Sequence, residues 1–140
     1  MKAQDLRLGN FVIAKNEIIK IIEFRESFVL GENNNCLIRC LPNQLEPIEL
    51  TEEVLFKIGF EKEERKSNIL YYLDYRINED EYIRVRYVIY NSKALPLLKI
   101  TSPSAIFFES HELTKRGIKY LHVLQNIYYC LTDKELEINL

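Results

Sequence analysis

The chain has 140 residues, of which 47% are hydrophobic and 29% are charged. A chain of this size buries about two thirds of its unfolded surface when it folds, so the composition excludes a wholly disordered or fibrous protein. Nineteen basic and 21 acidic residues give a net charge of −2. This balance excludes a global positive field that would recruit nucleic acid or an anionic membrane.

The first residues, MKAQD, bring an acidic residue at position 5 and lead into no apolar segment, so we expect no signal peptide. Uncharged apolar stretches such as residues 11–14 are far shorter than the ~20 residues that a membrane helix needs. The cysteines, Cys36, Cys40 and Cys130, are odd in number and fit reduced thiols. We therefore expect a soluble, cytoplasmic protein.

The N-terminal third favours short β-strands. Gly9 and Asn10 indicate a turn before a strand at residues 11–14, and the β-branched residues of 17–24 predict a second strand. Residues 28–30 and 36–40 predict two more strands, separated by the turn-favouring run GENNN. This series predicts an antiparallel β-meander or a small SH3-like barrel over residues 1–50.

A helix is predicted between Thr51 and Gly59. Thr51 suits the N-cap, Glu52 and Glu53 favour the electropositive first turn, and Gly59 suits a left-handed C-cap. A charged connector follows at residues 61–66.

Two alternating segments, 69–77 and 83–89, predict a β-hairpin. If both apolar sets lie on one face, Tyr75 pairs with Val85 and Asp74 lies opposite Arg86. Further strands are expected at residues 95–101 and 105–108.

The last helix is expected at residues 118–131, and residues 136–138 suggest a short terminal strand. Its apolar residues cover close to half of the helix circumference, which is typical of a helix that packs on a sheet. The predicted fold class is therefore α+β. A β-meander or SH3-like unit at residues 1–50 precedes an α+β unit at residues 51–140, with a sheet of three or four antiparallel strands and a long C-terminal helix packed on it. The two units could also share one core as a single domain.

Three stretches resemble a known group of sequences: residues 5–12 (DLRLGNFV), residues 46–60 (EPIELTEE through GF) and residues 118–132 (IKYLHVLQN through LT). In order and spacing they are similar to small hypothetical proteins from anaerobic gut bacteria and their phages. The resemblance implies a complete natural protein of the kind that mobile elements carry. It implies no activity and brings no site residue.

Metal binding is the first chemistry to consider. The spacing of Cys36 and Cys40 could begin a zinc site, but a second pair of ligands is needed. The remaining candidates, Cys130, His111 and His122, complete no known spacing. We expect buried or half-buried thiols and no metal or cofactor.

Catalytic motifs are absent from the sequence: it contains no GxSxG, P-loop, GxGxxG or HExxH pattern. His111 lies in a polar segment where a solvated histidine is expected. His122 has no acidic residue three or four positions away to raise its basicity. We expect no catalytic residue, and an enzyme with an unfamiliar site is the third hypothesis for function.

A polar strip runs along the predicted C-terminal helix. It comprises His122, Gln125, Asn126 and Tyr129, which recur at i, i+3, i+4 and i+7. Lys119 is the only charged residue nearby, whereas charges normally dominate a solvated helix face. One interpretation is a contact surface for a partner protein or a second copy of the chain, since tyrosine and uncharged amides suit interface cores. The other is that loops cover the strip and satisfy it internally.

The outer face of the predicted hairpin alternates arginine with tyrosine. Its candidate nucleic-acid residues are Tyr72, Arg76, Arg84 and Arg86, which could stack on bases and bind phosphates. Asp74, placed opposite Arg86, would neutralise part of this charge, and a solvated face with cross-strand pairs is the alternative. The first hypothesis for function is thus a small binding or accessory protein that acts through protein–protein contacts. A nucleic-acid-associated module is the second.

Overall fold

The computed structural model describes residues 5–34, 36–66, 68–76, 79, 82–90, 97–101, 111–112 and 118–139. The fold mixes α and β structure, consists mostly of strands, and its sheets are antiparallel, as the sequence predicts. The chain forms two compact units. The first contains residues 1–50 together with 120–136, and the second contains residues 51–119 together with 137–139.

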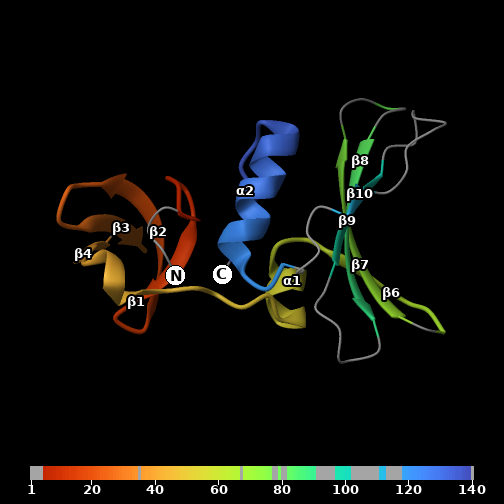
Figure 1. The fold of residues 1–140 in the computed structure, drawn as a ribbon, viewed down its shortest axis with the longest axis horizontal. Coiled ribbons are helices and arrows are strands. Elements are labelled where there is room, and N and C mark those ends of the chain that lie inside the picture. Colours follow the sequence, from red (N-terminus) through yellow and green to blue (C-terminus); the bar gives the residue numbers. More distant parts are fainter. Residues whose placement is uncertain are drawn as a thin grey trace. The chain divides into compact units, whose positions relative to one another are not determined.

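The sheet of the first unit is a meander. Its strands are β1 (Phe11–Ala14), β2 (Glu17–Phe24), β3 (Val29–Asn33), β4 (Cys36–Cys40) and β5 (Leu45–Glu46), with a 3-10 turn, η2, at Pro42–Gln44. The order across the sheet is β4-β3-β2-β1-β5, so the last strand returns to pair with the first (Figure 1). The expected strands at residues 11–14, 17–24 and 36–40 are confirmed with the same bounds.

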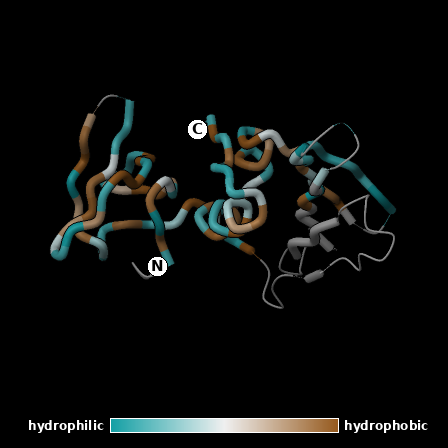
Figure 2. The backbone as a smooth tube through the Cα atoms, turned by 90° about the horizontal axis from the view of Figure 1, so that it is seen from above, coloured by the Kyte–Doolittle hydropathy of each residue, from teal (hydrophilic) through white to brown (hydrophobic). Residues whose placement is uncertain are grey.

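Alternate residues of β1, Val12 and Ala14, are buried in a small apolar core, and hydrophobic and hydrophilic stretches both occur along the backbone of this unit (Figure 2). The buried cluster consists of Val12, Ala14, Ile19, Ile21, Val29, Cys40 and Leu45. Gly31 lies against this cluster, since a Cβ at that position would be 2.5 Å from Cδ1 of Ile19. Glycine here lets β3 approach β2 closely enough to exclude water from the core.

The C-terminal helix, α2 (Leu121–Thr132), begins three residues later than expected and has 12 residues, so a long C-terminal helix is not confirmed. Tyr120 is extended and pairs with Glu49, while the N–H of Leu121 donates to the carbonyl of Ile48 at 2.9 Å. Pairing with the chain beyond β5 therefore holds residue 120 outside the helix.

The sequence places this helix on the sheet of residues 51–140, but in the structure it is part of the first unit. Its buried residues are Leu121, His122, Leu124, Gln125 and Tyr128. Two members of the polar strip, His122 and Gln125, thus belong to the buried side of α2, and the amide of Gln125 binds the chain at the start of β1, as described below.

The second unit begins with α1 (Glu52–Lys57), which confirms the predicted helix. The hydroxyl of Thr51 accepts the N–H of Val54 at 3.3 Å, and Gly59 adopts φ +87° just after the helix. The buried ring of Tyr71 packs edge-on against Phe56, and its hydroxyl donates to Glu52 at 2.6 Å. The N-terminal turn of α1 is tied in this way to the sheet of its own unit.

That sheet has the order β10-β9-β8-β7-β6. The strands are β6 (Glu61–Glu64), β7 (Asn68–Arg76), β8 (Tyr82–Tyr90), β9 (Leu97–Thr101) and β10 (His111–Glu112). The segment expected to be a charged connector is therefore an edge strand, β6, where charged side chains remain solvated.

The predicted hairpin is confirmed, but its predicted register is wrong by two residues. Asp74 pairs with Arg84 rather than with Arg86, and Leu73 pairs with Val85. A shift of two residues leaves every side chain on the same face, so the apolar alternation could not distinguish the two registers.

Two smaller expectations remain. Residues 136–138 form no strand, although Leu136 is buried; its apolar character reflects burial rather than strand pairing. The expected strand at residues 105–108 lies outside the described residues. Within the described part of the chain, no helix is both long enough and apolar enough to span a membrane.

The close approach at Gly31 predicts that Gly31→Ala lowers the free energy of unfolding by about 1–3 kcal/mol, because the new methyl group collides with Ile19. Adding Ile19→Val, which removes the Cδ1 atom nearest to the new methyl group, should recover part of that loss in the double variant. Urea denaturation of the two single variants and the double variant measures this coupling, and strictly additive effects would contradict the steric explanation.

Candidate functional site

The structure separates the residues of the predicted contact strip. The side chains of His122 and Gln125 are almost fully buried, with 3% and 1% of their surface exposed. Asn126 is half-buried, and Tyr129 is 38% exposed. The expectation that all four form an exposed contact surface is therefore wrong for the first two.

Gln125 and Asn126 bind the turn before β1. The side-chain carbonyl of Gln125 accepts the N–H of Phe11 at 3.0 Å, and its amide donates to the carbonyl of Gly9 at 3.1 Å. Asn126 accepts a hydrogen bond from the amide of the fully buried Asn10 at 2.9 Å and donates to the carbonyl of Asp5 at 3.0 Å. Three of these bonds are partly buried, so they satisfy polar groups that the packing of α2 shields from water.

Arg7 extends this network to the end of the helix. Its guanidinium forms a two-pronged ion pair with Glu135, at 2.6 and 2.9 Å, and lies 4.3 Å from the centre of the Tyr129 ring. The hydrogen bonds and charge of Arg7 lower the pKa of the Glu135 carboxyl group. Tyr129 is thus a partner of Arg7 within the unit rather than an unoccupied surface residue.

His122 is the member of the strip that the network does not absorb. Its Nδ1 atom is buried, and no described residue forms a hydrogen bond with it. The imidazole stacks on the ring of Tyr120, with 5.9 Å between the ring centres and 12° between the planes. Burial lowers the pKa of His122, an effect that the charge of Asp5 only partly offsets, so the ring is neutral near pH 7.

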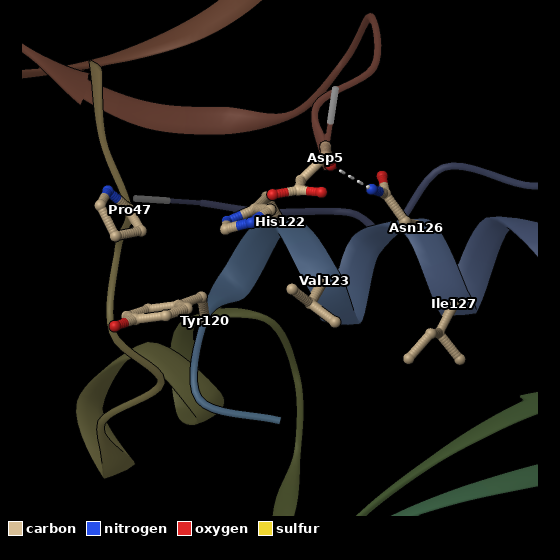
Figure 3. Close-up of a pocket in the computed structure, with 7 residues that line it drawn as sticks. All are labelled: Asp5, Pro47, Tyr120, His122, Val123, Asn126 and Ile127. Atoms are coloured by element: carbon tan, nitrogen blue, oxygen red, sulfur yellow. Dashed lines mark hydrogen bonds between the residues drawn. The ribbon is translucent and has the colours of Figure 1, made fainter. Parts of the chain in front are cut away.

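A pocket of about 510 Å³ opens beside this histidine (Figure 3). The lining residues come from three segments of the first unit: Asp5, Pro47, Tyr120, His122, Val123, Asn126 and Ile127. Asp5 extends toward His122 on one side, whereas Val123 and Ile127 form an apolar wall along the helix (Figure 3). A cavity of this size, mainly apolar with a few convergent polar groups, is typical of ligand sites.

The hairpin face differs from the predicted nucleic-acid surface. Arg84 forms a two-pronged ion pair with Asp74, both contacts at 2.6 Å, and lies 4.6 Å from the centre of the Tyr72 ring. The hydroxyl of Tyr72 donates to Glu61. Arg76 is exposed, and the side chain of Arg86 lies outside the described part. Arg84 and Tyr72 are therefore already engaged with acidic neighbours.

The three cysteines are divided between β4 and α2. Cys36 is exposed and Cys40 is buried at the two ends of β4, and Cys130 is exposed on α2. Burial raises the pKa of the Cys40 thiol. Among the described residues, no three histidine, cysteine or acidic side chains gather as a metal site.

The sequence pattern placed His122 in an exposed contact surface. It did not predict that Asp5, Pro47 and Tyr120 line a pocket with it. These residues are far from α2 along the chain or just before it, so no helical spacing could connect them to His122. One signal was available: a helix strip without charged neighbours must find its hydrogen-bond partners on other segments.

No protein-family model matches the chain, and no curated protein or solved structure matches it either.

The amide network predicts that Gln125→Ala destabilises the protein by about 2 kcal/mol or more, because Phe11 N–H and Gly9 C=O lose their partners in a buried place. Cys130→Ala is the matched control, since it truncates an exposed side chain on the same helix and should change stability by less than about 0.5 kcal/mol. Thermal and urea denaturation measure both. Equal stability of the two variants would contradict an internal role for Gln125.

The burial of His122 predicts a pH dependence of stability. Its pKa in the folded state lies below the ordinary value of 6.5, so below that pH the unfolded chain binds a proton that the folded chain does not. Stability contributed by the neutral ring is therefore complete above pH 6.5 and is lost as the pH falls through the folded-state pKa. Urea denaturation between pH 7.5 and 5 should show a smaller loss for His122→Phe, which keeps a ring at this position. An identical pH dependence in both proteins would contradict this assignment.

Proposed function

We propose that the chain is a small binding or accessory protein of the cytoplasm, which acts through contacts with another protein at the pocket beside His122. The observation that carries this proposal is the buried Nδ1 atom of His122, which no described residue satisfies and whose side chain lines an open cavity. A polar atom in such a place costs free energy unless a partner satisfies it, and a ligand group entering the pocket could be that partner.

The apolar wall supports a protein partner. Val123 and Ile127 are only half-buried although they are aliphatic, and with Pro47 they offer a surface that a partner's side chain can cover. Burial of such a surface supplies affinity, while a few polar groups supply orientation. The contact that we propose thus moves from the polar strip as a whole to the pocket at its N-terminal end.

The first unit also supports the interpretation as an SH3-like module. Five short antiparallel strands follow the order β4-β3-β2-β1-β5, and the 3-10 turn at Pro42–Gln44 precedes the strand that returns to β1. Small barrels of this kind often present peptide-binding surfaces. This support is an analogy of fold, and the site itself rests on the pocket.

The nucleic-acid alternative has weaker support. Asp74 neutralises Arg84, and Glu61 occupies the hydroxyl of Tyr72, so phosphate binding would have to displace both acidic partners. Arg76 alone is exposed among the described side chains proposed for that role. We therefore place this function second.

Site-specific photo-crosslinking tests the proposed contact. A benzophenone amino acid at position 127 should crosslink a host protein that the same group at position 37 does not capture, since Leu37 is 68% exposed on β4 and does not line the pocket. The captured protein, once purified, should bind the wild-type chain and lose at least tenfold in affinity for Val123→Arg, whose side chain fills the pocket.

Two results would contradict the proposal. One is that positions 127 and 37 capture the same proteins, which would indicate nonspecific contact. The other is a mobility shift of single- or double-stranded nucleic acid that weakens between about 50 and 200 mM salt and is lost in Arg84→Ala, which would favour the second function.

A further inference from the structure

The described residues that line the pocket beside His122 carry a net negative charge. Among the described residues, Asp5 is the one charged residue that lines it, and the imidazole of His122 is neutral near pH 7. Within the described part of the chain, no cation forms an ion pair with the exposed Asp5 carboxylate. Among the described lining residues, a ligand entering this pocket therefore meets one negative charge, that of Asp5.

The hydrogen-bonding groups of the pocket are also biased toward acceptors. The amide of Asn126 is occupied on both sides, since its nitrogen donates to the Asp5 carbonyl and its oxygen accepts from Asn10. The carboxylate of Asp5 can only accept, and the Nδ1 atom of a neutral imidazole accepts in one of its two tautomers. An anionic ligand would find repulsion from Asp5 and few donors, whereas a cationic donor would find two acceptors.

The remaining walls suit an aliphatic stem that ends in a cation. Pro47, Val123 and Ile127 line the pocket with apolar groups, and the stacked rings of Tyr120 and His122 offer an aromatic surface. Long basic side chains bury their methylene groups along apolar surface and place the charged end at polar groups or aromatic faces. An ammonium group directs three N–H donors in different directions and can therefore reach acceptors from two separate segments.

We infer that the pocket beside His122 receives a lysine side chain of the partner protein, with its ammonium group between the Asp5 carboxylate and the His122 imidazole. This inference rests on the proposed function and names the chemistry that the partner presents. The aliphatic stem lies along Val123 and Ile127, and the ammonium group provides the hydrogen bond that Nδ1 of His122 lacks.

Binding of single amino-acid amides tests the inference. Nα-acetyl-lysine amide should bind the intact chain with a Kd on the order of 1 mM, the affinity expected of a fragment of this size. Nα-acetyl-norleucine amide, which has the stem without the ammonium group, should bind about fivefold or more weakly. NMR chemical-shift titration of the backbone amides of α2 measures both, and the largest shifts should fall at residues 122–127.

Two variants and one control test whether Asp5 and His122 bind the ammonium group. Asp5→Asn should remove most of the preference for lysine over norleucine while leaving the weaker norleucine binding unchanged. His122→Phe should weaken lysine binding and keep the ring stack on Tyr120. Asp133→Asn is the matched control, because it removes one negative charge from the C-cap of α2, outside the pocket, at a position where asparagine tolerates the left-handed backbone (φ 53°).

The titration of His122 provides a readout that a purely structural role would not change. Among the described residues, Asp5 and Tyr120 face it; the charge of Asp5 raises the pKa of His122, and the charge of the amino terminus lowers it. A bound ammonium group disfavours the imidazolium form, so saturating Nα-acetyl-lysine amide should lower the pKa of His122, measured by NMR, whereas Nα-acetyl-norleucine amide should not.

Equal binding of the lysine and norleucine amides would overturn the inference, as would binding that Asp5→Asn leaves unchanged. Binding of n-butylammonium as tight as that of the lysine amide would overturn the assignment to a protein side chain in favour of a free small amine. These failures are distinct from failure of the proposed function, because the protein captured at position 127 would still bind and still be lost in Val123→Arg.

Discussion

The first unit depends on one side chain that closes it. Gln125, on the C-terminal helix, binds the N–H of Phe11 and the carbonyl of Gly9, which lie 114 and 116 positions earlier in the sequence. This amide fixes the rotation of α2: because residue 125 points inward, Leu121, Leu124 and Tyr128 are buried with it, and Val123 and Ile127 are left along the pocket. The amide of Gln125 and the apolar side chains of Leu121, Leu124 and Tyr128 thus agree on which side of the helix is buried.

The local structure could be predicted from the sequence where short-range rules decide it. The strands at residues 11–14, 17–24 and 36–40 follow from β-branched residues and turn signals, and α1 follows from its caps, Thr51 and Gly59. The hairpin register could not be predicted, because the alternation of apolar residues repeats every two positions and accepts a shift of that size.

The candidate site shows a different limit of prediction from sequence. Helical periodicity correctly grouped His122, Gln125 and Asn126, but it could not decide whether their polar groups meet solvent, a partner or the chain itself. The deciding groups are backbone atoms of Gly9 and Phe11 and the side chain of Asn10, which any turn sequence supplies. Asp5 and Pro47 enter the pocket for the same reason, since tertiary contacts rather than local pattern place them beside α2.

The split composition of the first unit has a consequence during synthesis on the ribosome. Its two parts, residues 1–50 and 120–136, are separated by the whole of residues 51–119. At ~5–20 residues per second, the roughly 70 intervening residues delay the arrival of α2 by about 4–14 s. Throughout that interval the nascent meander has been made but Gln125 has not. The N–H of Phe11 and the carbonyl of Gly9 therefore lack their partner on α2 until residue 125 is added. The unit whose synthesis begins first thus stays incomplete until nearly all of the second unit has been made.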